Sequence, residues 1–211
     1  MTFDYKKEYR DIYLPKEHPS VVEIPKIQYV VVRGQGNPNE KNGEYAEALG
    51  VLYGISYTIK MSYKGSRDIA GYFPYVVPPL EGLWWMADGS PGVDYNNKSD
   101  FCWISMIRLP EFVTPEVFEW AKAEAAVKKK IDTSRAEWLD FTEGLCVQIM
   151  HCGAYDNEPA AIEKMDAFAA AQGYKTDFCP ERRHHEIYLN DPRKTAPEKL
   201  KTVIRHPIRK A

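Results

Sequence analysis

Residues 145–153 read Leu-Cys-Val-Gln-Ile-Met-His-Cys-Gly, an apolar run that ends at a glycine. Such a run predicts a β-strand. Asp156 and Asn157 then predict a turn, and Pro159 opens a predicted helix that continues to about Gln172. Two further strands are expected, over 184–189 and 201–205. The order in this part of the chain is therefore strand, helix, strand, strand.

The same order occurs earlier in the chain. Tyr29–Arg33 is a β-branched run that ends at Gly34, 119 residues before Gly153. A turn follows, and apolar residues then recur at helical spacing from Tyr45 to Met61. The strands expected next cover 73–77, continuing as 82–87, and 101–109. The simplest interpretation is an internal duplication of a β-α-β-β unit.

These patterns predict an α+β fold in a single domain over residues 1–211. Its parts are an irregular lead-in (1–27), a first repeat (28–110), a connector helix (114–130) and a second repeat (139–208). Each repeat carries a helix on one face of an antiparallel sheet, so the opposite faces can meet in a central ligand cleft. The tandem units therefore predict a site for a small molecule.

Composition argues against several classes of partner. The chain has 28 Lys plus Arg against 30 Asp plus Glu, a formal net charge of −2, which gives no electrostatic reason to expect nucleic acid or anionic membrane as the main partner. No apolar run approaches the roughly 20 residues that cross a bilayer, and no secretory signal precedes the first strand. We therefore expect a cytoplasmic protein with no membrane partner. Its four cysteines show no paired spacing and are expected to be reduced and mostly buried.

The segment His184-His185-Glu186-Ile187-Tyr188-Leu189 holds the strongest candidates for chemistry. On a strand, Glu186 and Tyr188 share one face and Ile187 and Leu189 the other. If the Ile and Leu face packs on helices, Glu186 and Tyr188 line the open side, where Glu186 can bind a cation or act as a general base. The alternative is an ordinary exposed carboxylate on a strand.

Aromatic residues are the second signal, with 14 Tyr and 5 Trp in the chain. Alternation turns the neighbouring Trp84 and Trp85 to opposite faces, so one can face the cleft while the other is in the core. Core packing is the alternative for each aromatic candidate. The residues expected to contact a ligand are Trp84, Trp85, Trp103, Phe101, Tyr53, Tyr57, Tyr155 and His184.

Metal and cofactor sites are not predicted. Adjacent histidines on a strand point to opposite faces, and no other His or Asp spacing completes a ligand set with His184, so we expect no metal. The chain contains no P-loop, no G-x-S-x-G elbow and no dinucleotide fingerprint, so no cofactor is expected.

Two motifs resemble a known family. The segment from His184 to Arg193, continuing through Thr195–Leu200 to His206-Pro207, is similar to the C-terminal signature of stand-alone GyrI-like small-molecule-binding proteins. Pro79-Leu80-Glu81-Gly82-Leu83-Trp84-Trp85 resembles a second signature of the same subgroup, and the likeness extends over nearly the whole chain. The family fold is a tandem SHS2-type duplication of a β-α-β-β unit.

The resemblance implies a ligand cleft between the repeats with Glu186 at its centre. Family members fused to helix-turn-helix domains sense drugs, but the lead-in of this chain is too short for such a domain, so no direct DNA binding is expected. The stand-alone subgroup implies hydrolysis of cyclopropane-bearing DNA-alkylating natural products of the yatakemycin and duocarmycin type, with Glu186 and Tyr188 as catalytic residues and a flat aromatic ligand. The alternatives are non-catalytic binding of aromatic or cationic drugs, or inhibition of DNA gyrase.

Overall fold

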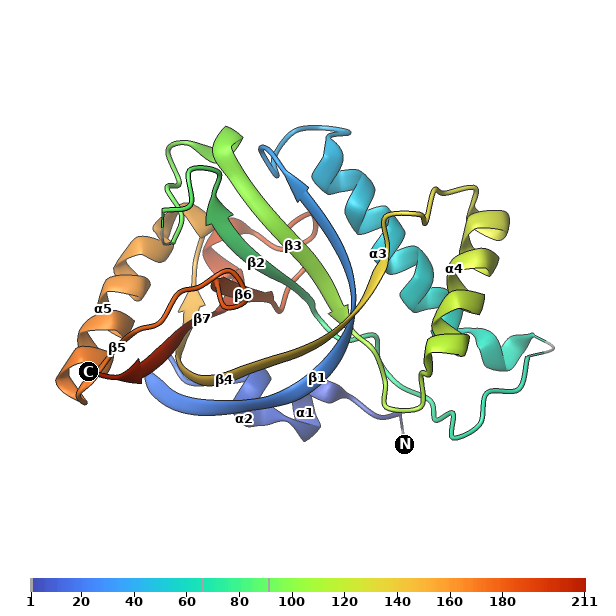
Figure 1. Cartoon of the computed structure of the whole chain (residues 1–211), viewed down its shortest axis with the longest axis horizontal. Helices are drawn as coiled ribbons and strands as arrows, with labels where there is room; N and C mark the ends of the chain where they lie inside the picture. Colours follow the sequence, from blue (N-terminus) through green and yellow to red (C-terminus); the bar gives the residue numbers. More distant parts are fainter. Residues whose placement is uncertain (1, 66, 91) are drawn as a thin grey trace.

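The computed structural model describes residues 2–65, 67–90 and 92–211. Its centre is a seven-stranded antiparallel sheet with the order β4-β1-β3-β2-β6-β7-β5, in which β4 pairs with both β1 and β7 (Figure 1). Because of the second pairing, the sheet closes into a barrel. The strands are β1 (Ser20–Gln35), β2 (Leu80–Met86), β3 (Phe101–Arg108), β4 (Glu137–Cys152), β5 (Tyr174–Thr176), β6 (His184–Tyr188) and β7 (Lys201–Lys210).

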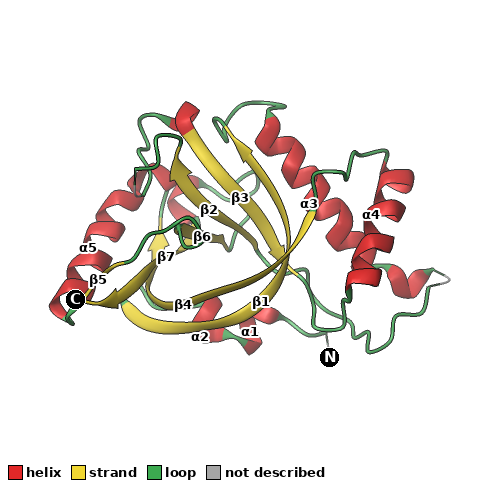
Figure 2. Ribbon diagram, in the orientation of Figure 1, coloured by secondary structure: helices red, strands yellow, loops and turns green. Residues whose placement is uncertain are grey.

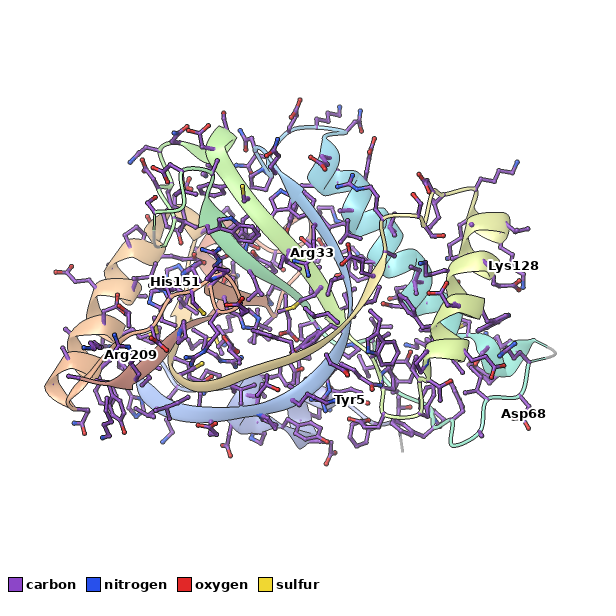
Figure 3. All side chains as sticks on the ribbon, in the orientation of Figure 1. Tyr5, Arg33, Asp68, Lys128, His151 and Arg209 are labelled. Atoms are coloured by element: carbon purple, nitrogen blue, oxygen red, sulfur yellow. The ribbon has the colours of Figure 1, made fainter. Side chains whose placement is uncertain are left out.

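Five α-helices are present among the described residues. They are α1 (Tyr5–Glu8), α2 (Arg10–Tyr13), α3 (Glu44–Lys60), α4 (Pro115–Lys129) and α5 (Glu158–Ala171). The helix α3 packs on β1 and β3, α5 packs on β4 and β5, and the central strands lie between them in Figure 2. The helix α4 packs on α3, and its Lys128 points away from the densely filled space between sheet and helices (Figure 3).

Local sequence explains the main elements. Apolar residues at helical spacing, including Ala48, Leu52 and Ile55, form the buried side of α3. The helix α4 begins with Pro115, and the Thr114 hydroxyl accepts a hydrogen bond from a backbone N–H of the first turn. Among the described residues, no helix is both long and apolar enough to span a membrane.

The strands have an outer face, toward α3 and α5, and an inner face, toward the inside of the closed sheet. Ile204 of β7 packs with Met165 of α5, and it pairs directly with Glu186 of β6. Glu186 therefore points outward together with His184 and Tyr188. The neighbouring His185 and Ile187 point inward.

Four charged residues form a buried cluster on the inner face, the inner network: Glu81, Glu143, His185 and Arg205. His185 contacts Glu143 through Nδ1 (3.0 Å) and Glu81 through Nε2 (3.1 Å), and the Arg205 guanidinium donates to Glu143 (2.9 Å). Burial alone would raise the pKa of Glu143, but the charges of His185 and Arg205 lower it to about 2. Burial would lower the pKa of His185, but Glu143 and Glu81 raise it to about 9.

The inner network also holds the N-terminal segment. Arg205 donates to the backbone carbonyl of Ile12 (2.8 Å), and the Tyr13 hydroxyl donates to Glu81 (3.3 Å). The prediction of an irregular lead-in over 1–27 is therefore wrong for residues 2–27, which contain α1, α2 and the start of β1. Met1 lies outside the described residues.

Some of the other predicted helices and strands are present in the structure and others are not. The predicted helices over 45–61, 114–130 and 159–172 are present as α3, α4 and α5. The strand predicted over 73–77 is wrong, because within it only Tyr75 makes an isolated bridge, to Phe3. The short strand β5 was not expected, and β1, β4 and β7 are longer than predicted. The internal duplication stays a prediction.

The expectation that the cysteines are mostly buried is wrong. All four are free thiols, but only Cys146 is buried, and Cys152 is exposed. Cys152 lies at the C-terminal end of β4, where the strand leaves the sheet and its side chain turns toward solvent.

Candidate functional site

Glu186 is the centre of a buried cluster on the outer face. The residue is only 6% exposed, although it carries a carboxylate. One carboxylate oxygen, Oε2, accepts a hydrogen bond from the Tyr188 hydroxyl (2.7 Å), and the other, Oε1, lies 2.9 Å from Nε2 of His184. The Trp84 indole N–H donates to the Tyr188 oxygen (2.9 Å), which directs the phenolic proton toward Glu186. Side chains of β6 itself, supported by Trp84 of the neighbouring β2, thus fix the orientation of this carboxylate.

A second carboxyl group lies beside it. Glu158 is the first residue of α5 and is fully buried, and its Oε2 accepts a hydrogen bond from the Tyr95 hydroxyl (2.7 Å). Burial and the nearby Glu186 carboxylate raise the pKa of Glu158 well above its usual value. Both effects favour the protonated form of Glu158. The site therefore combines two buried carboxyl groups, one of which is held by a phenol and an imidazole.

Aromatic rings enclose the two carboxyl groups. Tyr45, at the start of α3, contacts Trp84 and Trp103, with ring centroids 5.4 and 5.1 Å apart. Tyr155 packs edge-on against Tyr188 at 5.7 Å. Phe101 packs edge-on against Trp84, also at 5.7 Å. Flat apolar walls with few polar groups between them suit an aromatic ligand.

Gly82 allows the close packing at the centre of the site. It pairs with Glu186 across β2 and β6. A Cβ atom at this position would lie 2.5 Å from Trp84 Nε1 and 3.3 Å from the Tyr188 hydroxyl. Only glycine therefore leaves room for the hydrogen bond from Trp84 to Tyr188.

Several buried polar atoms of this region have no hydrogen-bond partner within the described residues. They are Trp103 Nε1, Ser105 Oγ, Glu158 Oε1 and Thr202 Oγ1. Trp103 and Ser105 share the outer face of β3, and Thr202 pairs with Tyr188 across β6 and β7. Donors and acceptors of this kind are available to a bound molecule.

A hollow of about 360 Å³ lies next to this cluster. It is lined by Val93, Asp94, Tyr95, Asn96, Asp156 and Pro159. Tyr95 both lines the hollow and bonds Glu158, so its side chain separates the buried carboxyl groups from the surface on this side. Lys98 and Asp156 form an ion pair that joins the same two segments.

Comparison with known proteins defines the family. The family model described as the GyrI-like small molecule binding domain matches residues 17–209. The chain belongs to this family. Among curated proteins, no sequence relative matches it.

Solved structures agree with this assignment of the GyrI-like domain. A Listeria innocua protein described as a hydrolase is 42% identical, with a TM-score of 0.89 over 99% of this chain and 100% of the other. A Listeria innocua protein described as uncharacterized and conserved gives 42% identity and a TM-score of 0.91 over the same shares. The C-terminal domain of EcmrR, at 12% identity and a TM-score of 0.51 over 92% of this chain and 98% of that one, shares the fold alone.

The GyrI-like domain brings together most of the residues predicted for the site. Glu186, Tyr188, His184, Trp84, Trp103, Phe101 and Tyr155 lie in or against one cluster. Trp85 points to the opposite face of β2, where the Arg183 guanidinium lies 5.0 Å from its ring. Tyr53 and Tyr57 pack against each other about two and three turns beyond Tyr45 on α3, and Tyr57 is 44% exposed.

The condition set for the two faces of β6 is not met. Helices do not cover the Ile187 face, and α3 and α5 instead supply Tyr45 and Glu158 to the Glu186 face. Closure of the sheet explains the difference, because the inside of the barrel must be filled and takes the Ile187 face.

Sequence reasoning missed Tyr45, Tyr95 and Glu158 as site residues. Tyr45 read as an apolar position of a helix, and Tyr95 lies in a loop. Glu158 directly precedes Pro159, a position at a helix start where an acidic residue is common. An acidic residue at the start of α5 would be a signal only if its burial were known.

Glu158 also bears on metal binding. One ligand atom from each of Glu158, His184 and Glu186 lies within 4.8 Å of the others. The sequence argument that nothing completes a set with His184 missed Glu158, which comes from α5 rather than from the strand. Two buried carboxyl groups side by side are stabilised by either a cation or a proton between them.

Proposed function

We propose that this GyrI-like domain hydrolyses reactive cyclopropane-bearing DNA-alkylating natural products of the yatakemycin and duocarmycin type, in a detoxification role. The observation that carries the proposal is the buried Glu186, oriented by Tyr188 and His184 inside an aromatic enclosure. The protein described as a hydrolase, with 42% identity, supports a hydrolytic reaction. The proposed reaction needs no cofactor.

The reaction adds water across a strained ring. Water oxygen bonds to a cyclopropane carbon, the ring C–C bond breaks, and its electron pair moves through the conjugated dienone to the carbonyl oxygen, which becomes a phenolate. One proton leaves the attacking water and one is needed at the phenolate oxygen, so the overall change is the addition of one water molecule. An enzyme must supply a base near the ring carbon and a proton donor near the oxygen.

Glu186 is the base in this proposal. A positioned general base contributes on the order of 10²–10⁴-fold to the rate. Tyr188 could in principle donate to the dienone oxygen, but its proton is directed to Glu186 and its oxygen accepts a hydrogen bond from Trp84. We assign Tyr188 to orienting Glu186.

Glu158 fits the role of proton donor. Its raised pKa favours the protonated form, and its Oε1 has no hydrogen-bond partner within the described residues. A neutral carboxyl group can donate to the dienone oxygen and transfer its proton as the phenolate forms. The rings of Trp84, Trp103 and Tyr155 would stack on the flat ligand and exclude bulk water.

A rival function is binding without turnover. The matching family model describes a small-molecule binding domain, and a buried carboxylate among aromatic rings suits a flat or cationic drug. Sequestration of such a drug needs the same residues but no water attack. Inhibition of DNA gyrase is a further alternative that needs no small molecule.

The test is loss of the dienone absorbance when purified protein is mixed with a duocarmycin-type compound. With the natural protein we expect the dienone absorbance to fall faster than in buffer. Glu186→Gln should abolish turnover but still bind the compound. Glu137→Gln, which changes a half-exposed carboxylate on β4, should leave turnover unchanged. Absence of turnover in the natural protein contradicts hydrolysis. Ligand binding alone then supports sequestration, and slower supercoiling by gyrase without any added compound supports the gyrase alternative.

A further inference from the structure

Glu158, His184 and Glu186 bring three possible metal ligands close together. One ligand atom from each residue lies within 4.8 Å of the others, and all three residues are buried. Glu186 Oε1 lies 2.9 Å from His184 Nε2. Glu158 Oε1 is buried and has no hydrogen-bond partner within the described residues. A buried, unpartnered carboxyl oxygen beside two further ligand atoms is suited to bind a cation.

The second oxygen of each carboxyl group is already held by a tyrosine. Glu158 Oε2 accepts a hydrogen bond from the Tyr95 hydroxyl, and Glu186 Oε2 accepts one from the Tyr188 hydroxyl, both at 2.7 Å. These contacts leave the Oε1 atom of each group to face its neighbours. Side chains that bind metals are commonly oriented in this way, by hydrogen bonds to the atoms that do not touch the ion.

A relay of two further side chains orients His184. His184 Nδ1 lies 2.8 Å from His206 Nε2, and His206 Nδ1 lies 2.9 Å from Asp166 Oδ1. A histidine that binds a metal usually donates its other ring N–H to an acceptor, and a carboxylate often completes such an arrangement. When His184 donates through Nδ1, its Nε2 carries the lone pair that a metal ion needs.

The balance of charge favours a divalent ion. Among the described residues, no lysine or arginine forms an ion pair with Glu158 or Glu186. A divalent cation would neutralise the two carboxylates, so the buried set would carry no net charge. One imidazole nitrogen with two carboxylate oxygens is a donor set that suits zinc, whereas magnesium prefers six oxygen ligands and keeps several of its waters.

The distances fit a small ion after a modest adjustment of side chains. A tetrahedral Zn²⁺ holds nitrogen and oxygen ligands at about 2.0–2.2 Å, which places the ligand atoms about 3.4 Å from one another. The 2.9 Å contact between His184 and Glu186 must therefore open slightly. The widest separation in the set, at most 4.8 Å, must close by no more than about 1.4 Å. Three protein ligands leave a fourth position for water.

We propose that Glu158, His184 and Glu186 bind a divalent transition-metal ion, with Zn²⁺ as the best match to the donor set. Because the ion takes both carboxyl groups, it removes the base and the proton donor of the proposed reaction together. Zinc binding and hydrolysis therefore exclude each other, and zinc acts as an inhibitor of the site. The inhibition rests on the proposed function, whereas the metal site itself does not.

The first measurement titrates chelator-treated protein with Zn²⁺ in competition with a zinc-sensitive dye. We expect the natural protein to bind one equivalent per chain with a Kd of about 1 µM or tighter. Glu158→Gln should lose this binding, whereas Glu163→Gln, an exposed change on the same helix, should keep it. Tyr95→Phe retains all three ligands but not the hydrogen bond to Glu158, so it should bind about tenfold more weakly.

These variants separate a metal site from a loss of folding. Circular dichroism checks that each variant is folded, and Tyr95→Phe still tests the site if Glu158→Gln does not fold. Absence of stoichiometric binding by the natural protein overturns the inference. Equal binding by Glu158→Gln and Glu163→Gln, or by Tyr95→Phe and the natural protein, also overturns it.

Cobalt identifies the ligands by absorption spectroscopy. Co²⁺ in the natural protein should give the intense visible bands of a four-coordinate ion, and excess Zn²⁺ should remove them while Mg²⁺ should not. A thiolate charge-transfer band would instead place the ion at a free cysteine such as the exposed Cys152, and would overturn the assignment.

The last measurement follows the dienone absorbance of a duocarmycin-type compound with and without one equivalent of Zn²⁺, and Zn²⁺ in buffer alone is the blank. Zinc should slow turnover on the order of 10²-fold, since it occupies the general base, and a chelator should restore the rate. Unchanged or faster turnover with bound zinc overturns the inhibition. If the zinc-free protein has no hydrolase activity, the proposed function fails while the zinc titration still decides the metal site.

Discussion

The inner network gives the clearest quantitative prediction, because its charges balance. Glu81 and Glu143 supply two negative charges, and His185 and Arg205 supply two positive ones. The substitution Glu143→Gln keeps the shape of the side chain but removes one negative charge. His185 and Arg205 are then left with one buried carboxylate between them, and burying an uncompensated charge is costly.

The pKa values set the size of the effect. The pKa of Glu143 falls from 4.5 to about 2, and that of His185 rises from 6.5 to about 9. Each shift corresponds to about 3 kcal/mol. Both shifts include the mutual attraction of Glu143 and His185, so they must not be added. We expect Glu143→Gln to lower the free energy of unfolding by about 3 kcal/mol.

Urea unfolding at pH 6 measures this loss as a lower midpoint at an unchanged slope. Glu137→Gln on the same strand is the matched control, because its ion pair with Arg33 is about half exposed on both sides. Exposed pairs contribute about 0–1 kcal/mol, so this variant should unfold close to the natural protein. Equal losses for the two variants, or a loss below about 1 kcal/mol for Glu143→Gln, would refute the assignment of the inner network as a balanced charge cluster.

Three further predictions concern pH and the site. The stabilisation from Glu143 is complete above pH 4.5 and is lost toward pH 2, while the stabilisation from His185 is complete below pH 6.5 and is lost as pH rises through 9. Thermal unfolding should therefore show the highest stability between pH 4.5 and 6.5, and a maximum above pH 8 would contradict this. Gly82→Ala should weaken the binding of a duocarmycin-type compound about tenfold by displacing Trp84, as measured by calorimetric titration. The control Gly50→Ala, which has open space around its Cβ, should bind the compound as the natural protein does. Trp84→Phe removes the donor to Tyr188 and should slow turnover about fivefold, a loss of about 1 kcal/mol, while Trp85→Phe on the opposite face should leave the rate unchanged.

The sequence predicts the parts of the fold that depend on residues close together along the chain. The three long helices and the alternation along β6 follow from apolar spacing, so the shared face of Glu186 and Tyr188 could be foreseen. The sequence could not predict whether this face would point into the closed sheet or out of it. That orientation depends on the pairing of β4 with β7, which closes the sheet and turns Ile187 inward.

The missed site residues have the same cause. Glu158 reaches Glu186 from α5, and Tyr95 reaches Glu158 across a separation of 63 residues. No local pattern distinguishes a buried carboxyl group from a solvated one at a helix start. Burial, and with it the raised pKa of Glu158, is a property of the assembled fold rather than of the segment.

The two faces of β6 depend on each other through register. His185 is fixed on the inner side by carboxylates from β2 and β4, and Glu186 is fixed on the outer side by Tyr188 and His184. A slip of one residue would exchange the faces, placing Glu186 inside and His185 outside, and would lose both sets of hydrogen bonds together. The buried charges of the inner network thus penalise every register except the one that points Glu186 into the candidate site. Loss of Glu143 should therefore disturb the orientation of Glu186, although the two side chains lie on opposite faces of the sheet.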